Sequence, residues 1–285
     1  MRGLLNLSKS ANIAAIHFLL GELPIEAKLQ RDIFSLFYSV WSNPESKIYK
    51  IVKYLLENLS DRSNTWSIHM KMLSHKYGLI DPSECLKSGP PPKSQYKETV
   101  ITKITAYYEN KLRVMAANNS RMTYLNVSLS GLRGYHHPSL SHIITSHDVR
   151  KSRIHIKMLA GDYFTYEIKS KHSGGGPQCR CCQYPSPPES ISHVLASCNA
   201  YNDIRQRMFP HYNFLCTQSK SKIDFNEISS DGEKLCQFIL DPTSCSLTSR
   251  IHVTDPILKA IFRLSRDYCY AVNAVRIRML RSTTN

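Results

Sequence analysis

The sequence predicts a mainly α-helical protein with a small metal-binding segment near its C-terminal third. Apolar side chains recur every three or four residues through most of the chain, the period of helices that pack one face on a core. Three cysteines and one histidine then follow a metal-ligand spacing in one short window that also contains Cys181: Cys179, Cys182, His193 and Cys198. The hydrophobic fraction of 42% is that of an ordinary globular protein, so a packed core is expected.

The N-terminal region, residues 1–88, is expected to be helical. One helix should follow Pro24, because proline is favoured in the first turn of a helix. A second helix is expected around residues 48–56, and a third from Trp66 to Tyr77, where Gly78 provides a typical C-terminal stop. The side chains expected to line the core are Ile25, Leu29, Ile33, Leu36, Phe37, Val40, Ile48, Ile51, Val52, Leu55, Leu56, Trp66, Met70, Leu73 and Tyr77.

Three consecutive prolines, 90–92, cannot continue a helix. They predict a linker before a second region, residues 94–170. This region should hold a long helix whose apolar face carries Val100, Ile104, Tyr107, Tyr108 and Met115. Residues 149–160 fit either a helix or a strand.

The region 94–170 is strongly basic, and tyrosines interleave with its lysines and arginines. Cations bind phosphates and rings stack on bases, so this composition is typical of a nucleic-acid surface. A solvated helix face above core tyrosines fits equally well, and both interpretations stay open. Four histidines of a loop match no zinc spacing and are expected to be ordinary polar residues: His136, His137, His142 and His147.

The cysteine–histidine window defines a third region, residues 171–216. Its spacing is C-x2-C-x10-H-x4-C. The first pair fits a tight turn, and a short helix should present the second pair from neighbouring turns. Four such ligands predict one tetrahedral Zn²⁺, and a closed ligand set indicates a structural site because no coordination position stays open for substrate. Zinc binding of this kind supplies about 10–16 kcal/mol to folding in zinc-finger peptides.

The ligand set leaves one alternative open. Cys181 adjoins Cys182, and either can pair with Cys179, although the two-residue spacing to Cys182 is the more usual. His172 and Cys216 are more distant substitutes. Free thiols without a metal are the remaining interpretation. A retroviral-type knuckle is disfavoured, because that motif has about four residues between its second cysteine and its histidine.

The last region, residues 217–285, begins with a polar stretch and should contain a short helix near residues 235–240. A long final helix is expected from Asp255 and Pro256, both suited to a first turn. Apolar residues from Ile257 to Val275 line one side of it, while lysines and arginines cover the others.

Charge and cysteine usage narrow the class of protein. Lys and Arg number 37 against 22 Asp and Glu, a formal charge of +15 that favours a polyanionic partner. Nine cysteines in a chain of 285 residues are typical of a reducing compartment rather than a disulfide scaffold. The N-terminus does not resemble a signal peptide, and no segment reaches the roughly 18 apolar residues of a membrane span. We therefore expect an intracellular protein, cytoplasmic or nuclear, without a membrane partner.

The motif and its flanks resemble the C-terminal zinc-binding region of non-LTR (LINE-type, jockey-like) retrotransposon reverse transcriptases. The resemblance rests first on Cys179-x2-Cys182…His193-Val-Leu-x2-Cys198 followed by Tyr201-x3-Arg205. More moderate matches are Leu19-Leu-Gly-Glu-Leu-Pro-Ile-Glu-Ala27, Asn64-Thr-Trp66-Ser-Ile68, Tyr124-Leu-Asn126 and Ile261-x2-Leu-x3-Tyr268-Cys269-Tyr270. The resemblance covers most of the chain and implies contact with element RNA or target DNA.

The polymerase chemistry of that family does not carry over. Its Tyr-x-Asp-Asp turn has no counterpart here, and two-metal phosphoryl transfer needs such clustered carboxylates. The acids after the motif (Asp224, Glu227, Asp231 and Glu233) lack a nuclease spacing. The chain therefore resembles the tail of such a protein, either as a fragment or as a separate gene product.

The sequence thus predicts a zinc-stabilised nucleic-acid-binding module, without catalysis, whose partner is RNA or DNA. The alternative is a zinc-organised protein-interaction module that docks on a polymerase, such as that of the same element. The expected metal ligands are Cys179, Cys182, His193 and Cys198. The expected nucleic-acid contacts are Lys111, Arg113, Arg150, Lys151, Arg153, Arg263, Arg266, Arg276, Arg278 and Arg281.

Overall fold

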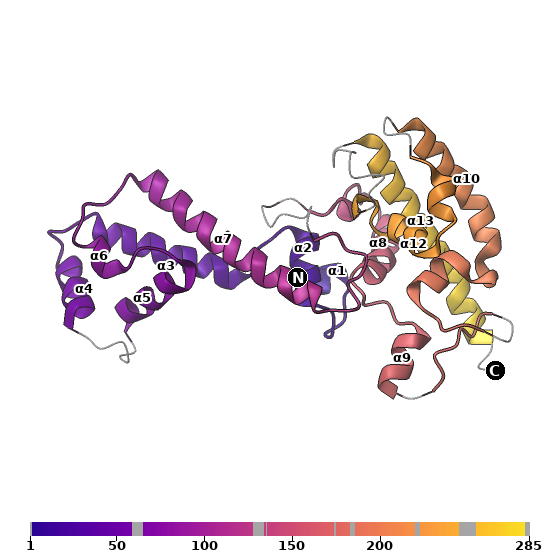
Figure 1. Cartoon of the computed structure of the whole chain (residues 1–285), viewed down its shortest axis with the longest axis horizontal. Coiled ribbons are helices and arrows are strands. Elements are labelled where there is room, and N and C mark those ends of the chain that lie inside the picture. Colours follow the sequence, from indigo (N-terminus) through magenta and orange to yellow (C-terminus); the bar gives the residue numbers. More distant parts are fainter. Residues whose placement is uncertain are drawn as a thin grey trace. The chain divides into compact units, whose positions relative to one another are not determined.

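The chain is mostly helical, as predicted, and the computed structural model contains no β-strand in the ranges it describes (Figure 1). Those ranges are residues 2–58, 65–127, 134, 136–173, 175–182, 186–219, 223–244 and 255–282. The chain forms two compact units. Unit 1 comprises Met1–Gly21 and Met115–Asn285, and unit 2 comprises Glu22–Val114.

Unit 2 is a set of helices around one apolar core. Its helices are α3 (Ile25–Trp41), α4 (Lys47–Asn58), α5 (Trp66–Tyr77), α6 (Pro82–Cys85) and most of α7 (Lys93–Ala117). Aromatic side chains dominate the buried cluster, which includes Phe34, Phe37, Trp41, Tyr77 and Tyr108. Rings of this size bury the most apolar area per residue, so they carry most of the packing energy of a small unit.

The apolar stripes expected on the first two helices of unit 2 are only partly buried. On α3, Leu29 and Leu36 are more than half exposed, whereas Phe34 and Phe37 are buried. On α4, Val52 and Leu56 are buried, whereas Ile48 and Ile51 are exposed. Each of these helices packs through one narrow face, because a small unit offers few partners.

The third expected helix is confirmed as α5. The Thr65 hydroxyl accepts from the Ile68 backbone N–H at its start, and Gly78 ends it with φ of 61°. That left-handed conformation favours glycine, which has no Cβ to clash. Met70, Leu73 and Tyr77 are buried, as expected of the core face.

The proline segment lies within unit 2 and does not separate two regions. The Tyr38 hydroxyl donates to the Pro91 carbonyl over 2.7 Å, and the Trp41 indole donates to the Ser88 carbonyl over 2.9 Å. These bonds hold the segment on α3, so the expected division at residues 88–94 differs from the observed one. The unit boundaries fall instead after Gly21 and near the end of α7.

Unit 1 combines two short N-terminal helices with the whole C-terminal half of the chain. Its α-helices are α1 (Arg2–Leu5), α2 (Ile13–Leu20), α8 (Ser146–Leu159), α9 (Tyr166–Ser173), α10 (Asn202–Gln218), α11 (Phe225–Ser229), α12 (Gly232–Leu240) and α13 (Pro256–Ser282). Short 3₁₀ or π turns complete it: η1 (Pro138–Leu140), η2 (His193–Ser197), η3 (Asn199–Tyr201) and η4 (Pro242–Ser244).

The ambiguous residues 149–160 belong to the helix α8. Thr145 and Asp148 form a capping box in which each side chain accepts from the other's backbone N–H, and this local signal favours helix over strand. Gly161 follows with φ of 67°, and a Cβ there would lie 2.2 Å from the Arg121 carbonyl oxygen. Glycine is therefore required both by conformation and by space.

The long helix α13 organises the core of unit 1. It packs against α8, α10 and α12, whose labels surround it in Figure 1. Its Tyr268 joins a cluster of rings with Tyr212, Phe225 and Phe238. Within the described ranges, no helix combines the length and hydrophobicity needed to span a bilayer.

Candidate metal centre

The first two cysteines of the motif lie on a loop closed by backbone pairing. The Cys179 N–H donates to the Pro187 carbonyl, and the Glu189 N–H donates to the Pro177 carbonyl, both over 2.8 Å. An isolated antiparallel bridge joins Gln178 to Pro188 between them. The pairing places Cys179 beside the segment that leads to His193.

The second pair of the motif is set by a π-type turn. The Cys198 N–H donates to the His193 carbonyl over 2.8 Å, five residues back, so η2 is wider than an α-helical turn. The Ser190 hydroxyl accepts from the His193 N–H over 3.0 Å at the start of this segment. The sequence predicted a short helix with His193 and Cys198 on neighbouring turns. The structure has a wider π-type turn instead, which places both residues on the same side of the segment.

The four side chains converge on one point. Their ligand atoms all lie within 4.8 Å of one another. Cys182 Sγ lies 3.3 Å from His193 Nε2 and 3.3 Å from Cys198 Sγ, and Cys179 Sγ lies 3.9 Å from Cys198 Sγ. Metal–ligand bonds of about 2.1–2.3 Å imply tetrahedral edges of about 3.5–3.8 Å. The observed spacing fits such an ion, so Cys179, Cys182, His193 and Cys198 can hold one metal.

The structure favours Cys182 over Cys181 as the ligand. Cys181 lies in a different group with Cys179 and the carboxylate of Glu189, away from the histidine. Of the more distant substitutes, His172 contacts Arg121, and Cys216 is buried in α10. Neither joins a metal-sized group within the described residues.

Hydrogen bonds favour the thiolate at one of the three cysteines and orient the histidine ring. Hydrogen bonds from the Cys181 and Cys198 thiols hold the pKa of Cys179 well below its usual value, which favours the thiolate that binds metal. The hydrogen bond to Cys179 raises the pKa of Cys198, and burial raises that of Cys182, so these two thiols would lose their protons on binding a metal. His193 Nδ1 lies 3.2 Å from the Ser197 hydroxyl. A metal on Nε2 requires the proton on Nδ1, where the Ser197 oxygen accepts it and fixes the ring.

A buried ion pair lies directly beside the cluster. The Glu189 side chain is fully buried, with one carboxylate oxygen 4.0 Å from Cys179 Sγ. Arg276 of α13 donates to both carboxylate oxygens over 2.9 and 2.7 Å, and the Tyr166 N–H donates to the same carboxylate over 2.7 Å. The pair ties the cysteine loop to the long C-terminal helix, and it raises the pKa of Arg276 despite desolvation by burial.

Arg205 gives the Tyr201-x3-Arg205 pattern a structural role. Its guanidinium is buried and donates to the Cys198 carbonyl and to the Asn202 side chain. Tyr201 is fully buried against the same segment, beside Cys181. The Tyr201-x3-Arg205 pattern therefore stabilises the backbone around Cys198, the fourth candidate ligand.

Two arginines expected to contact nucleic acid lie in the core. Arg276 pairs with Glu189, and Arg266 donates to the carbonyls of Ser139 and Ser141 over 3.2 and 2.6 Å. Both are less than a tenth exposed. Their guanidinium groups hold unit 1 together, because a buried cation needs partners for its donors. Neither side chain is therefore available to contact nucleic acid.

The other expected contact residues lie nearer the surface. Lys151 is half-buried and pairs with Asp267 over 2.7 Å, which joins α8 to α13, and Arg113 is half-buried on α7. The remaining side chains are exposed: Lys111 in unit 2, and Arg150, Arg153, Arg263, Arg278 and Arg281 in unit 1.

The sequence did not reveal a buried network around Asp241. This carboxylate is fully buried, lies 3.2 Å from His137 Nε2, and accepts from the Thr243 hydroxyl and the Asn126 N–H. Burial raises the pKa of Asp241, but its partners outweigh that effect and the net shift is downward. His137, expected to be an ordinary loop residue, is a buried part of this network. Asn126 and His137 lie more than 100 residues from Asp241, so no local motif marks the network.

The sequence matches no known family model, and no characterised protein or solved structure shows significant similarity to it.

Proposed function

We propose that the chain is a zinc-stabilised nucleic-acid-binding module. The observation that carries the proposal is the closed Cys3His cluster of tetrahedral size, in a chain with a formal charge of +15. Three thiolates and an imidazole are the ligand set that zinc prefers over hard cations. Four protein ligands leave no open position, so the metal would organise the fold and not activate a substrate.

The basic surface of unit 1 supports the nucleic-acid part of the proposal. Arg150 and Arg153 lie exposed on α8, and Arg263 lies exposed on α13, which packs against α8. Their guanidinium groups suit phosphate oxygens, to which they can donate two parallel hydrogen bonds. The resemblance to the tail of non-LTR reverse transcriptases adds element RNA or target DNA as the polymer class, and no polymerase activity is proposed for this chain.

The metal part is tested by elemental analysis of the purified full chain. About one zinc per chain is expected, and Cys182→Ser should lose it. Cys181→Ser is the matched control, because Cys181 lies outside the four-ligand cluster; it should retain the metal. Equal loss in the two variants, or a metal-free wild type, would contradict the assignment.

The nucleic-acid part is tested by fluorescence anisotropy with labelled RNA and DNA over a range of salt. Affinity should fall as salt rises, with a slope that grows by about 0.7–0.9 for each phosphate contacted. Replacing Arg150, Arg153 and Arg263 together by glutamine should reduce that slope by about 2. The control replaces Lys171, Arg207 and Lys234, which are also exposed cations of unit 1. Absence of salt-dependent binding by the wild type would refute this function.

A protein-interaction module remains a second candidate, favoured by one observation. In unit 2 the outer faces of α3 and α4 expose large apolar side chains, including Ile25 (67%), Leu29 (57%), Ile48 (61%) and Ile51 (58%). Such surfaces favour protein partners over phosphates. High affinity for a polymerase partner that is insensitive to salt, and that is lost in Leu29→Asp/Ile51→Asp, would support this candidate.

A further inference from the structure

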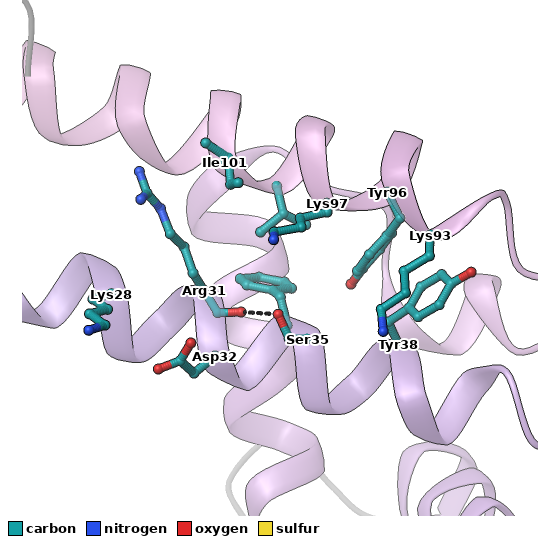
Figure 2. Close-up of a pocket in the computed structure, with 11 residues that line it drawn as sticks. Lys28, Arg31, Asp32, Ser35, Tyr38, Lys93, Tyr96, Lys97 and Ile101 are labelled. Atoms are coloured by element: carbon teal, nitrogen blue, oxygen red, sulfur yellow. Dashed lines mark hydrogen bonds between the residues drawn. The ribbon is translucent and has the colours of Figure 1, made fainter. Parts of the chain in front are cut away.

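Unit 2 contains a pocket between α3 and α7 (Figure 2). Its volume is about 270 Å³, close to the lower end of small-ligand sites at about 300 Å³. Phe34 and Val100 are buried beneath it, and Tyr38 and Tyr96 line it with half-buried rings. The pocket therefore has an apolar floor and aromatic walls.

The rim of the pocket is cationic. Lys28, Arg31, Lys93 and Lys97 line it against a single carboxylate, Asp32. The three lysines are exposed, and none of them makes an ion pair within the part of the chain that the structure describes. Like charges gathered around one hollow repel each other, and a bound anion relieves that repulsion.

Arg31 adds an unsatisfied donor. Its side chain is half-buried, and Nη2 donates to the Thr105 hydroxyl over 2.7 Å. Its Nε atom is buried with no hydrogen-bond partner. An unpaired buried N–H of a charged group is unfavourable, so a shift of the Arg31 side chain that let an anionic oxygen reach Nε would be favoured. Desolvation by burial lowers the pKa of Arg31.

The aromatic wall is held in place before any ligand binds. The ring centroids of Tyr38 and Tyr96 lie 5.0 Å apart, and the Tyr38 hydroxyl is anchored on the Pro91 carbonyl. Fixed rings suit base stacking because little side-chain freedom is lost on binding. The helix α7 begins at Lys93 with no acidic residue in its first turn, so the partial positive charge of its N-terminus is not offset there.

We propose that this pocket binds one nucleotide of a single-stranded nucleic acid, with the phosphate held by Arg31 and the lysines and the base against Tyr38 and Tyr96. The inference rests on the nucleic-acid binding proposed above and assigns part of it to unit 2. Neither the metal motif nor the basic surface of unit 1 includes these residues.

The test compares two triple variants of the full chain. Lys28→Gln/Lys93→Gln/Lys97→Gln removes the exposed pocket cations. Lys50→Gln/Lys53→Gln/Lys103→Gln removes three exposed cations of the same unit outside the pocket, with the same change in net charge. None of the six lysine side chains makes an ion pair or a side-chain hydrogen bond within the described residues. Both variants should therefore keep the wild-type circular dichroism and melting temperature. Binding to fluorescent oligouridylate is measured against salt, with duplex DNA as a second probe.

The pocket variant should bind oligouridylate about tenfold more weakly at about 0.1 M salt, with a slope smaller by about 1–2, while the control stays within about twofold. Equal weakening of both variants, or of neither, overturns the pocket and leaves nucleic-acid binding standing. A wild-type protein that binds duplex DNA but not oligouridylate also overturns the pocket and leaves nucleic-acid binding standing. Wild type that binds neither polymer overturns both proposals. Arg31→Lys, which keeps the charge, should bind better than Arg31→Gln if the phosphate lies at this residue.

Discussion

The two units bury different kinds of side chain. The described core of unit 2 is aromatic and aliphatic, and the side-chain amide oxygen of Gln30 accepts hydrogen bonds from the hydroxyls of Tyr77 and Tyr108. Unit 1 buries charged groups as well. Among the described residues, every buried Asp, Glu and Arg lies in unit 1: Glu189, Arg205, Asp241, Arg266 and Arg276. Unit 2 should therefore respond mainly to lost packing, and unit 1 to changes in metal, charge and pH.

Removal of the proposed metal should produce the largest difference in stability between the two units. Metal binding at a Cys3His site contributes on the order of 10–16 kcal/mol to folding, more than the whole stability of a typical domain. A chelator should therefore unfold unit 1 around the cysteine loop while unit 2 keeps its protection. Limited proteolysis followed by mass spectrometry measures the protection of both units from cleavage in one sample. Simultaneous loss of protection in both units, or no change in unit 1, would contradict the contrast.

Breaking the buried ion pair should produce the next largest effect. Arg276→Met leaves the Glu189 carboxylate buried without its cation, which costs about 3–5 kcal/mol in the free energy of unfolding. The matched control is Arg278→Met, since Arg278 is exposed on the same helix. Urea denaturation of unit 1 checks both variants. An equal midpoint for the two would mean that the pair contributes nothing to folding.

A packing defect should act on unit 2 in the same range of energy. Phe34 is 1% exposed, so Phe34→Ala should lower the free energy of unfolding of unit 2 by about 3–5 kcal/mol. Leu36→Ala removes an exposed side chain two residues away and should change it by less than about 0.5 kcal/mol. Thermal denaturation at two pH values is the measurement. If the loss of unfolding free energy in Phe34→Ala varied strongly with pH, the proposed difference between the two units would be contradicted.

The smallest expected effect is a pH dependence confined to unit 1. His155 is fully buried, and desolvation, with the nearby Arg266 and His137, lowers its pKa from 6.5 to about 4, although the Ile239 carbonyl and Asp241 act the other way. Between these values the unfolded chain binds a proton that the folded chain does not. The contribution of neutral His155 to the free energy of unfolding is therefore fully present above pH 6.5. It falls by about 3 kcal/mol as the pH drops to 4.

His155→Gln should flatten that slope while keeping a donor for the Ile239 carbonyl. The exposed His142 serves as the control, because His142→Gln leaves the buried network unchanged. Chemical denaturation of unit 1 at pH values from 7 to 4 provides the profile. A wild-type slope that persisted in His155→Gln would assign the dependence to another group.

Local patterns in the sequence predicted local structure well. The helical class, the helices α5, α7 and α13, and the four clustered ligands all follow from spacings of a few residues, which the backbone converts directly into position. The choice between Cys181 and Cys182 could not be made from spacing alone. It depends on the pairing of the loop with Pro187, which turns Cys181 toward Glu189 and Cys182 toward His193.

Long-range partners were beyond the reach of those patterns. Arg276 looked like one more cation on a basic helix, and only the fold brings Glu189, 87 residues away, against it. Likewise, periodicity marked Leu29 and Leu36 as apolar but could not tell which face of α3 would find a partner. Charge counts and apolar stripes describe a side chain, whereas burial depends on what the rest of the chain places against it.

The π-type turn between His193 and Cys198 also limits how this segment can change in length. Its five-residue hydrogen bond accommodates the four intervening residues, and Val194 and Leu195 are fully buried within it. Deleting one residue would return the turn to an α-helical register, rotating one ligand away and pulling a core side chain to the surface. Insertions and deletions should thus be tolerated poorly here, so a fixed H-x4-C interval is the feature by which distant relatives of this chain can be sought.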